Sequence, residues 1–366
     1  MPRVLTSYGA SLGWLLACAI GIGLVAAWCA RPLGLCAVAA SDPAASGATA
    51  GKGAPMAVGL VWDERFLAHD APSHVEKAAR LTSIRCALQE AHLWDRLVQI
   101  AAVPAAESDL LRVHSPEHIL RVQRTAESAQ TVWLDGDTYA GKASWEAARL
   151  AAGGACAAVD AVMRGDVRSA FCALRPPGHH ASRDKAAGFC LFNNVAIAAR
   201  HAQAVHGVPR IVIFDWDVHH GNGTQDTFYR DGHIMYISIH QSPLYPRTGS
   251  AEETGEGPGA GRIRNFPLAP GSGEKEFLAA LDEGLKLAEA FRPEFVFISC
   301  GFDAHKDDTL GGLKLTEHTY AEATRRVRSL ADRAAHGRIV SVLEGGYNLD
   351  AIGRCAVAHV SALLDP

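Results

Sequence analysis

Apolar runs of five or six residues, separated by polar and glycine-containing segments, recur along most of the chain. Their length and their content of β-branched and aromatic residues are typical of buried strands. The runs occupy residues 57–62, 169–174, 210–214, 234–239, 295–300 and 339–343. The pattern therefore predicts a sheet whose strands are spread over nearly the whole chain.

Helix signals lie between these predicted strands. Ser115 is a good N-cap residue and is followed by a first-turn proline and an early acid. Ser144 opens an alanine-rich run that stops at Gly165, and Thr316 opens another that extends to Gly337. Strands that alternate with helices predict one α/β domain with a mainly parallel sheet. Ligands of such sheets bind outside the carboxyl ends of the strands.

The predicted strand at 210–214 leads into the segment Asp-Trp-Asp-Val-His-His-Gly-Asn-Gly-Thr. Alternate side chains of an extended chain share a face, so Asp215, Asp217 and His219 are expected to point the same way. Two carboxylates and an imidazole suit zinc or iron(II). The simpler interpretation, a capped strand end with solvated charges, would leave these groups beside a core strand without partners.

A second predicted strand supplies the rest of this metal site. Asp303 follows the run at 295–300, so it is expected at the same edge of the sheet. Asp217, His219 and Asp303 are then three protein ligands. Three ligands leave a coordination position for water, which is typical of a catalytic metal site.

Further polar groups follow three other predicted strands. The strand at 169–174 leads into a proline- and glycine-containing loop with His179 and His180, and the strand at 339–343 leads to Tyr347. The strand at 234–239 ends at His240. One such residue alone would indicate packing or surface exposure, whereas five strand ends with polar groups indicate an active site.

These segments together resemble the zinc-dependent histone deacetylase superfamily, which includes acetylpolyamine amidohydrolases and acetoin-utilisation proteins. Asn222, where some members have Asp, resembles the class II and bacterial branch. The resemblance covers about residues 57–364 and implies a three-layer α/β/α fold of the arginase and deacetylase type. The matching segments are RPPGHHA (175–181), GFCLFNN (188–194), DWDVHHGNGT (215–224), YISIHQ (236–241), SCGFDAHKDDTLGG (299–312) and LEGGYN (343–348).

The resemblance implies one zinc ion per chain, bound by Asp217, His219 and Asp303. It also implies potassium near the site. One potassium site would use the Ser238 hydroxyl and the backbone oxygens of Asp215, Asp217, His219 and Ile239. A second would involve Phe228, Asp231 and Ile234.

The same resemblance implies catalytic roles in removing an acyl group from an amine. His179 and His180 would be the paired catalytic histidines, with Asp215 behind the first and Asn222 behind the second. An amide is a poor electrophile, so zinc must polarise its carbonyl and activate water. His180 would take the proton of that water and return one to the amine, and Tyr347 would stabilise the oxyanion.

A substrate tunnel is also implied by the resemblance. Gly188, Phe189 and Tyr245 match the walls that grip a linear aliphatic chain. Leu310 matches a rim position that is acidic in some polyamine-selective relatives, which argues against a dedicated polyamine enzyme. Arg247 stands where the family usually has glycine. The segment at 74–78 is a degenerate form of a histidine- and proline-rich family motif. These departures concern specificity rather than the reaction.

The two ends of the chain differ in character. Residues 4–30 contain no charged group, so residues 1–40 are expected to form a signal peptide or a membrane anchor, and 41–56 a flexible Ala/Gly/Ser linker. Residues 57–366 would be the catalytic domain, periplasmic or membrane-anchored. The alternative is a cytoplasmic protein whose translation begins at Met56.

Net charge and cysteine spacing bear on possible partners and on disulfides. A net charge of −4 over 366 residues, without a basic stripe, argues against direct nucleic-acid binding. Six of the nine cysteines lie beyond the leader, and none forms a CxxC pair, so buried free thiols are expected.

The sequence argues against two other functions. An arginase-like ureohydrolase would need two manganese ions and additional carboxylates, and would have no use for the tandem histidines. A non-catalytic acyl-lysine binding module would be expected to lack a ligand, the base or the phenol, all of which are present. Protein acetyl-lysine, acetylpolyamines and small amides all remain possible substrates, and the oligomeric state is left open.

Overall fold

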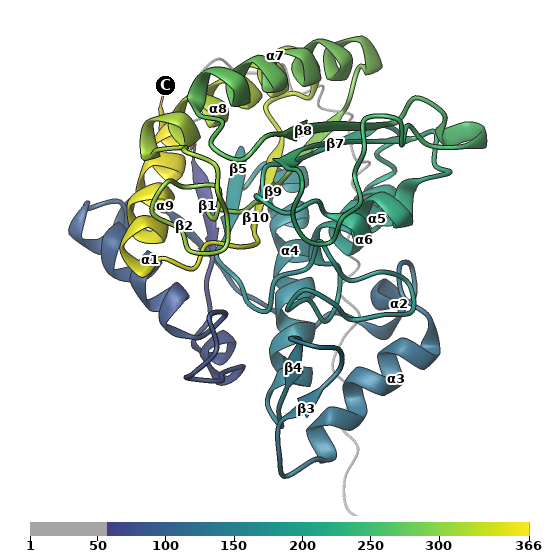
Figure 1. The fold of residues 1–366 in the computed structure, drawn as a ribbon, viewed down its shortest axis with the longest axis vertical. Helices are drawn as coiled ribbons and strands as arrows, with labels where there is room; N and C mark the ends of the chain where they lie inside the picture. The colour runs from purple at the N-terminus through teal and green to yellow at the C-terminus, as the bar shows by residue number, and fades with distance from the viewer. Residues whose placement is uncertain (1–56, 366) are drawn as a thin grey trace, which may run out of the picture. The chain divides into compact units, whose positions relative to one another are not determined.

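The computed structural model describes residues 57–365, and their centre is an eight-stranded sheet in which every neighbouring pair is parallel (Figure 1). The strand order is β2-β1-β5-β10-β9-β6-β7-β8. The strands are β1 (Val58–Val61), β2 (Val98–Ile100), β5 (Ser169–Cys172), β6 (Ile211–Asp215), β7 (Ile234–Gln241), β8 (Ile263–Leu268), β9 (Phe295–Cys300) and β10 (Ile339–Leu343). Two short strands, β3 (Val132–Trp133) and β4 (Tyr139–Ala140), form a separate antiparallel pair.

Helices cover both faces of the sheet, as Figure 1 shows, which confirms the three-layer α/β/α fold. Neighbouring contacts connect one layer in the order α1 (Ala79–Glu90), α9 (Leu349–Leu364), α8 (Glu317–Ala334) and α7 (Glu274–Phe291). The other layer contains α4 (Ser144–Arg164), α5 (Asn194–His206) and α6 (Asn222–Phe228), with the short α2 (Glu107–Leu110) beside α5. Helix α3 (Pro116–Arg124) precedes the β3–β4 pair along the chain.

The six predicted strands are all present, and those at 295–300 and 339–343 have the predicted bounds. The central strands are buried along their whole length, as expected for a parallel sheet covered on both faces. The pattern did not predict the edge strands β2 and β8. Edge strands tolerate polar residues and proline, and β8 contains both, including Pro267.

All three predicted helices are present, although α8 ends at Ala334 rather than at Gly337. The Ser115 side chain accepts a hydrogen bond of 3.3 Å from the His118 amide at the start of α3. Helix α4 ends at Gly165, which has a φ of 79°. Such a left-handed residue closes a helix, and glycine adopts it without steric cost.

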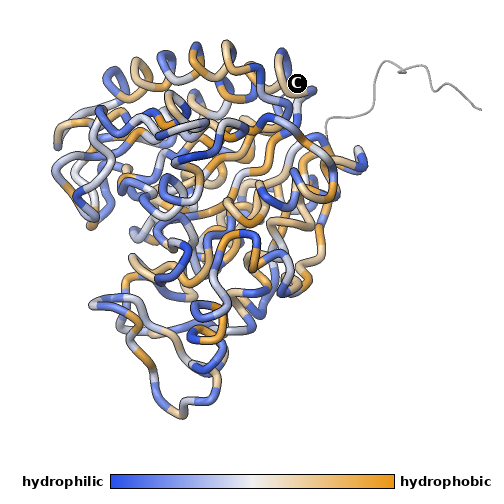
Figure 2. The backbone as a smooth tube through the Cα atoms, turned by 90° about the vertical axis from the view of Figure 1, so that its right-hand side faces the viewer, coloured by the Kyte–Doolittle hydropathy of each residue, from blue (hydrophilic) through white to orange (hydrophobic). Residues whose placement is uncertain are grey.

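Hydrophobic residues concentrate along the central strands and on the inward faces of the helices (Figure 2). Of the six described cysteines, five are buried and Cys86 is exposed, and none of the six forms a disulfide. The predicted leader and linker lie outside the described residues. Within residues 57–365, no helix combines the length and the hydropathy that crossing a bilayer requires.

Candidate metal centre and active site

Three neighbouring strands bring the predicted site residues together. Strand β9 pairs with β6 on one side and with β10 on the other, so their carboxyl ends meet at one edge of the sheet. Asp215 at the end of β6 lies opposite Ser299, and Leu343 at the end of β10 lies opposite Cys300. The loops that follow these three strands carry the predicted metal ligands and Tyr347.

Asp217, His219 and Asp303 form one buried cluster whose potential ligand atoms all lie within 4.8 Å of one another. His219 Nδ1 lies 3.0 Å from Asp217 Oδ1 and 3.2 Å from Asp303 Oδ2. Although His219 Nδ1 is close to it, Asp303 Oδ2 is buried and accepts no hydrogen bond within the described part of the chain. A buried carboxylate oxygen without a hydrogen bond is costly unless it binds a cation, so the donor set fits a metal ion.

Gly345 closes this cluster from the β10 side. Its amide donates a 2.8 Å hydrogen bond to Asp217 Oδ2, and a Cβ atom at this position would collide with carboxylate oxygens of both Asp217 and Asp303. Burial and the neighbouring Asp217 charge raise the pKa of Asp303 to about 7. A bound divalent cation would relieve this repulsion between two buried carboxylates.

The paired histidines have different partners. His179 Nδ1 lies 3.0 Å from Asp215 Oδ2, whereas His180 Nδ1 lies 2.8 Å from the amide oxygen of Asn222. Asp215 also accepts a 2.8 Å hydrogen bond from the Tyr236 hydroxyl. Asp215 therefore lies beside His179, as the family resemblance implies, and the metal cluster consists of Asp217, His219 and Asp303.

These partners set opposite charges on the two rings. Burial lowers the pKa of His179, but the carboxylates of Asp215, Asp217 and Glu344 outweigh it and raise that pKa to about 10. Burial and the charges of its histidine neighbours hold the pKa of His180 well below its usual range. The ring centroids are 4.0 Å apart, so a charged and a neutral imidazole lie side by side.

Glu344 is a buried residue of this site to which the sequence reasoning gave no role. Its Oε2 accepts hydrogen bonds from the amides of Gly178 (2.7 Å) and His179 (3.1 Å). Burial raises its pKa to about 7. The carboxylate thus connects the loop after β10 to the histidine loop after β5. The available signal in the sequence was the position of Glu344, an acidic residue that follows a predicted buried strand and precedes two glycines.

Tyr347 is held through its backbone. Asp308 Oδ2 accepts hydrogen bonds from the amides of Tyr347 (2.6 Å) and Asn348 (3.0 Å). The Arg80 guanidinium lies 4.9 Å from the centre of the Tyr347 ring and donates to the carbonyl of Gly346. Burial raises the pKa of the Tyr347 hydroxyl well above its usual range, so the hydroxyl stays protonated and can donate a hydrogen bond.

A buried network of charged residues holds Arg80, which contacts Tyr347. Glu76, fully buried, pairs with Arg175 at 2.5 Å and with Arg80 at 2.9 Å. The Tyr139 hydroxyl donates to the Glu76 carbonyl at 3.1 Å. Glu76 lies within the degenerate motif at residues 74–78, and its role was not predicted from the sequence. Its spacing of four residues from Arg80 was the available signal.

A cavity of about 250 Å³ leads to this centre, and it includes all four residues predicted for the tunnel. Phe189 has a φ of 71°, and a Cβ at the preceding Gly188 would collide with the His180 ring. Arg247 also adopts a left-handed φ, of 69°, at the position where the family usually has glycine. The lining residues are Asp137, His180, Gly188, Phe189, His219, Leu244, Tyr245, Leu310 and Tyr347; Asp137 and Leu244 were not predicted.

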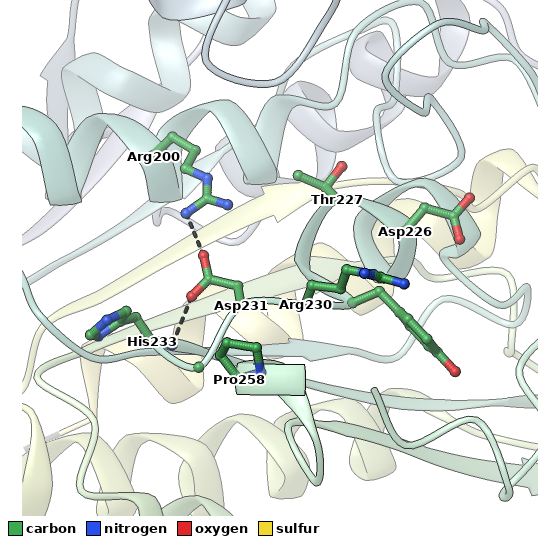
Figure 3. Close-up of a pocket in the computed structure, with 9 residues that line it drawn as sticks. Arg200, Asp226, Thr227, Arg230, Asp231, His233 and Pro258 are labelled. Carbon is green, nitrogen blue, oxygen red and sulfur yellow. Dashed lines mark hydrogen bonds and ion pairs between the residues drawn. The ribbon is translucent and has the colours of Figure 1, made fainter. Parts of the chain in front are cut away.

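The residues predicted to bind potassium lie in two places. Ser238 is in register with Asp215, and its hydroxyl lies 2.8 Å from His240 Nδ1. At the second place, the Asp231 carboxylate pairs with Arg200 at 2.5 Å and accepts from the His233 amide at 2.7 Å (Figure 3). Arg200 therefore competes with any cation for this carboxylate. The open pocket around it has a volume of about 620 Å³.

Comparison with known proteins shows to which family the chain belongs. A family model described as the histone deacetylase domain matches residues 74–363. A histone deacetylase-like amidohydrolase of Pseudomonas aeruginosa is 41% identical over 295 residues, which are 80% of this chain and 77% of that protein. A probable deacetylase of Archaeoglobus fulgidus is 39% identical and covers 85% of this chain and 89% of its own length.

A solved structure also resembles this chain. The crystal structure of the HDA15 HD domain superposes with a TM-score of 0.80 at 38% identity, and covers 84% of this chain and 89% of that one. The chain therefore belongs to the histone deacetylase family, a family of deacetylases and amidohydrolases.

Proposed function

We propose that this protein is a zinc-dependent amidohydrolase that removes acetyl or similar acyl groups from acylated amines. The observation that carries the proposal is the convergence of three kinds of group on one 250 Å³ cavity. His219 of the metal-ligand trio, the neutral ring of His180 and the protonated phenol of Tyr347 all line this cavity. Amide hydrolysis needs one of each.

Zinc bound by Asp217, His219 and Asp303 would polarise the amide carbonyl and acidify the attacking water. The neutral ring of His180 accepts the proton of this water and passes it to the departing amine nitrogen. The Tyr347 hydroxyl donates a hydrogen bond to the carbonyl oxygen as that oxygen gains negative charge.

The charged His179 does not act as the base in this scheme. Its proton is held by Asp215, and its positive charge keeps the adjacent His180 neutral. Asn222 orients His180 through a neutral amide and therefore adds no charge that would stabilise the protonated ring.

The walls of the cavity favour a linear acylated amine. Phe189 and Tyr245 are aromatic, and Leu310 is apolar, so the chain next to the reacting amide should be aliphatic. We propose potassium as an additional ion near Ser238, bound chiefly by backbone oxygens, as the family resemblance implies. Arginase-like chemistry is disfavoured because Ala304 and His305, rather than another acid, follow Asp303.

A panel of acyl amides separates the remaining substrates. Purified protein of known metal content should hydrolyse acetyl-lysine peptides, acetylated polyamines or small aryl acetamides, and should leave arginine and agmatine intact. Release of urea from a guanidino substrate, or no hydrolysis of any acyl amide by zinc-loaded protein, would refute the proposed function.

A further inference from the structure

A second group of potential metal ligands lies away from the cavity. It contains Asp160 on α4 and both His201 and His206 on α5. Helix α5 begins directly after the loop that lines the active site and ends at His206, shortly before β6 begins at Ile211. The group therefore lies near the amino ends of the strands, at the edge of the sheet opposite the active site.

The three side chains converge on one point. Asp160 Oδ1 lies 2.9 Å from His201 Nε2 and 2.7 Å from His206 Nε2. The two imidazole rings are 5.9 Å apart and steeply inclined to each other. The side chains are 34% (Asp160), 11% (His201) and 20% (His206) exposed, so the site is formed within the protein yet open to solvent.

A second carboxylate lies behind His201. Asp109 Oδ1, on α2, is 3.2 Å from His201 Nδ1, and Asp109 is itself held by Arg112 at 3.1 Å. Both ring nitrogens of His201 therefore face a carboxylate. A neutral imidazole has one N–H and can donate to only one of them. A metal ion on Nε2 would leave Nδ1–H to donate to Asp109, the carboxylate–histidine–metal arrangement that orients ligands in metalloproteins.

We propose that Asp160, His201 and His206 bind a second metal ion, a divalent transition metal such as zinc. Two imidazoles and a carboxylate suit zinc, and bond lengths of roughly 2.0–2.2 Å require only small shifts of the side chains from their present separations. The ion would link α4 to α5 and, through Asp109, to α2. Because it lies at the far edge of the sheet, it stabilises the fold and takes no part in the reaction.

The test is the zinc content of the full-length protein after equilibration with micromolar zinc and gel filtration. Wild type should retain two equivalents, and a His201→Gln/His206→Gln variant one, with turnover unchanged. Asp109→Asn should weaken the second zinc by about 10–100-fold while leaving the ligands in place. His336→Gln, which changes an exposed histidine elsewhere, should retain both ions.

Two further variants keep the proposal falsifiable. Asp217→Ala should lose the catalytic ion but keep the zinc that depends on His201. Asp160→Asn removes one ligand with little change of shape, and should lower zinc content even if the double histidine variant does not fold. The proposal is wrong if wild type retains only the ion that Asp217→Ala removes, or if Asp160→Asn and His201→Gln bind as much zinc as wild type. In that case Asp160, His201 and Asp109 form only a hydrogen-bonded chain between the helices.

Discussion

The adjacent histidines of the active site differ in charge because their partners differ. Asp215 stabilises the protonated form of His179, and Asn222 offers His180 no such charge. We therefore expect His180→Ala to lower turnover by about 10²–10⁴-fold, the usual contribution of a general base. His179→Ala should cost less, and both variants should retain zinc. Steady-state kinetics with metal analysis on the same samples measure this. Equal and small losses would mean that neither ring is the base.

The Tyr347 hydroxyl offers a second prediction at the level of one residue. Tyr347→Phe removes the hydrogen-bond donor but keeps the ring that packs against Phe189 at 5.7 Å. Turnover should fall by roughly 10²–10³-fold with little change in KM, since the lost interaction forms mainly in the transition state. A rise in KM at constant kcat would instead assign Tyr347 to substrate binding.

Single residues also show where sequence reasoning reaches its limit. The metal trio, the paired histidines and Tyr347 could be predicted because each follows an apolar strand in a parallel sheet. Glu76, Glu344 and Asp308 could not be given roles in this way. Each also contacts a segment distant in sequence, and those contacts become visible only in the structure, as with the His179 amide that donates to Glu344.

In the loop after β9, the Asp308 carboxylate holds two backbone amides of the loop after β10. Asp308→Ala should remove the acceptor for the Tyr347 and Asn348 amides and lower kcat by about 10–100-fold, because misplacing a catalytic group by an ångström is costly. In a Tyr347→Phe background the same change should cost little more. The matched control is Asp307→Ala, which alters an exposed neighbour that pairs with Lys306.

A positioning role requires this non-additivity. If Asp308→Ala lowers kcat by the same factor with and without the Tyr347 hydroxyl, Asp308 acts through some other group. If Asp307→Ala has an equal effect, the loop as a whole matters rather than this carboxylate.

Among the elements, burial decided which strands could be predicted. The central strands are apolar throughout because both faces are covered, and their runs stand out in the sequence. The edge strands β2 and β8 are partly exposed and carry polar side chains, so their sequences resemble loops. The helix ends at Ser115 and Gly165 followed from capping chemistry that is local in sequence.

For the whole molecule, buried neutral histidines predict how stability depends on pH. The two ring nitrogens of His114 form hydrogen bonds with the Ser182 carbonyl and the Asn193 amide. Burial lowers the pKa of His114 to about 3. Burial likewise lowers the pKa of His359 to about 3. The unfolded chain takes up these protons near pH 6.5 and the folded chain only near pH 3. The stabilisation is therefore complete above pH 6.5 and is lost as the pH falls from 6.5 towards 3.

Denaturant unfolding at a series of pH values measures this dependence. His359→Gln should reduce the slope of unfolding free energy between pH 6 and 4 by about 1.4 kcal/mol per pH unit, the share of one proton. His336→Gln, which makes the same substitution at an exposed position, serves as the control. A slope unaffected by His359→Gln would mean that this ring is protonated in the folded protein.

The most direct test of the proposed function is to measure zinc content and turnover together in wild type and in Asp303→Ala. Asp303 Oδ2 has no hydrogen-bond partner among the described residues, so the metal site should depend on it. We predict that chelation abolishes amide hydrolysis by wild type, that zinc restores it, and that Asp303→Ala loses one equivalent of zinc together with its turnover. Full activity in a chelated, zinc-free sample, or activity that requires two manganese ions, would contradict a single catalytic zinc.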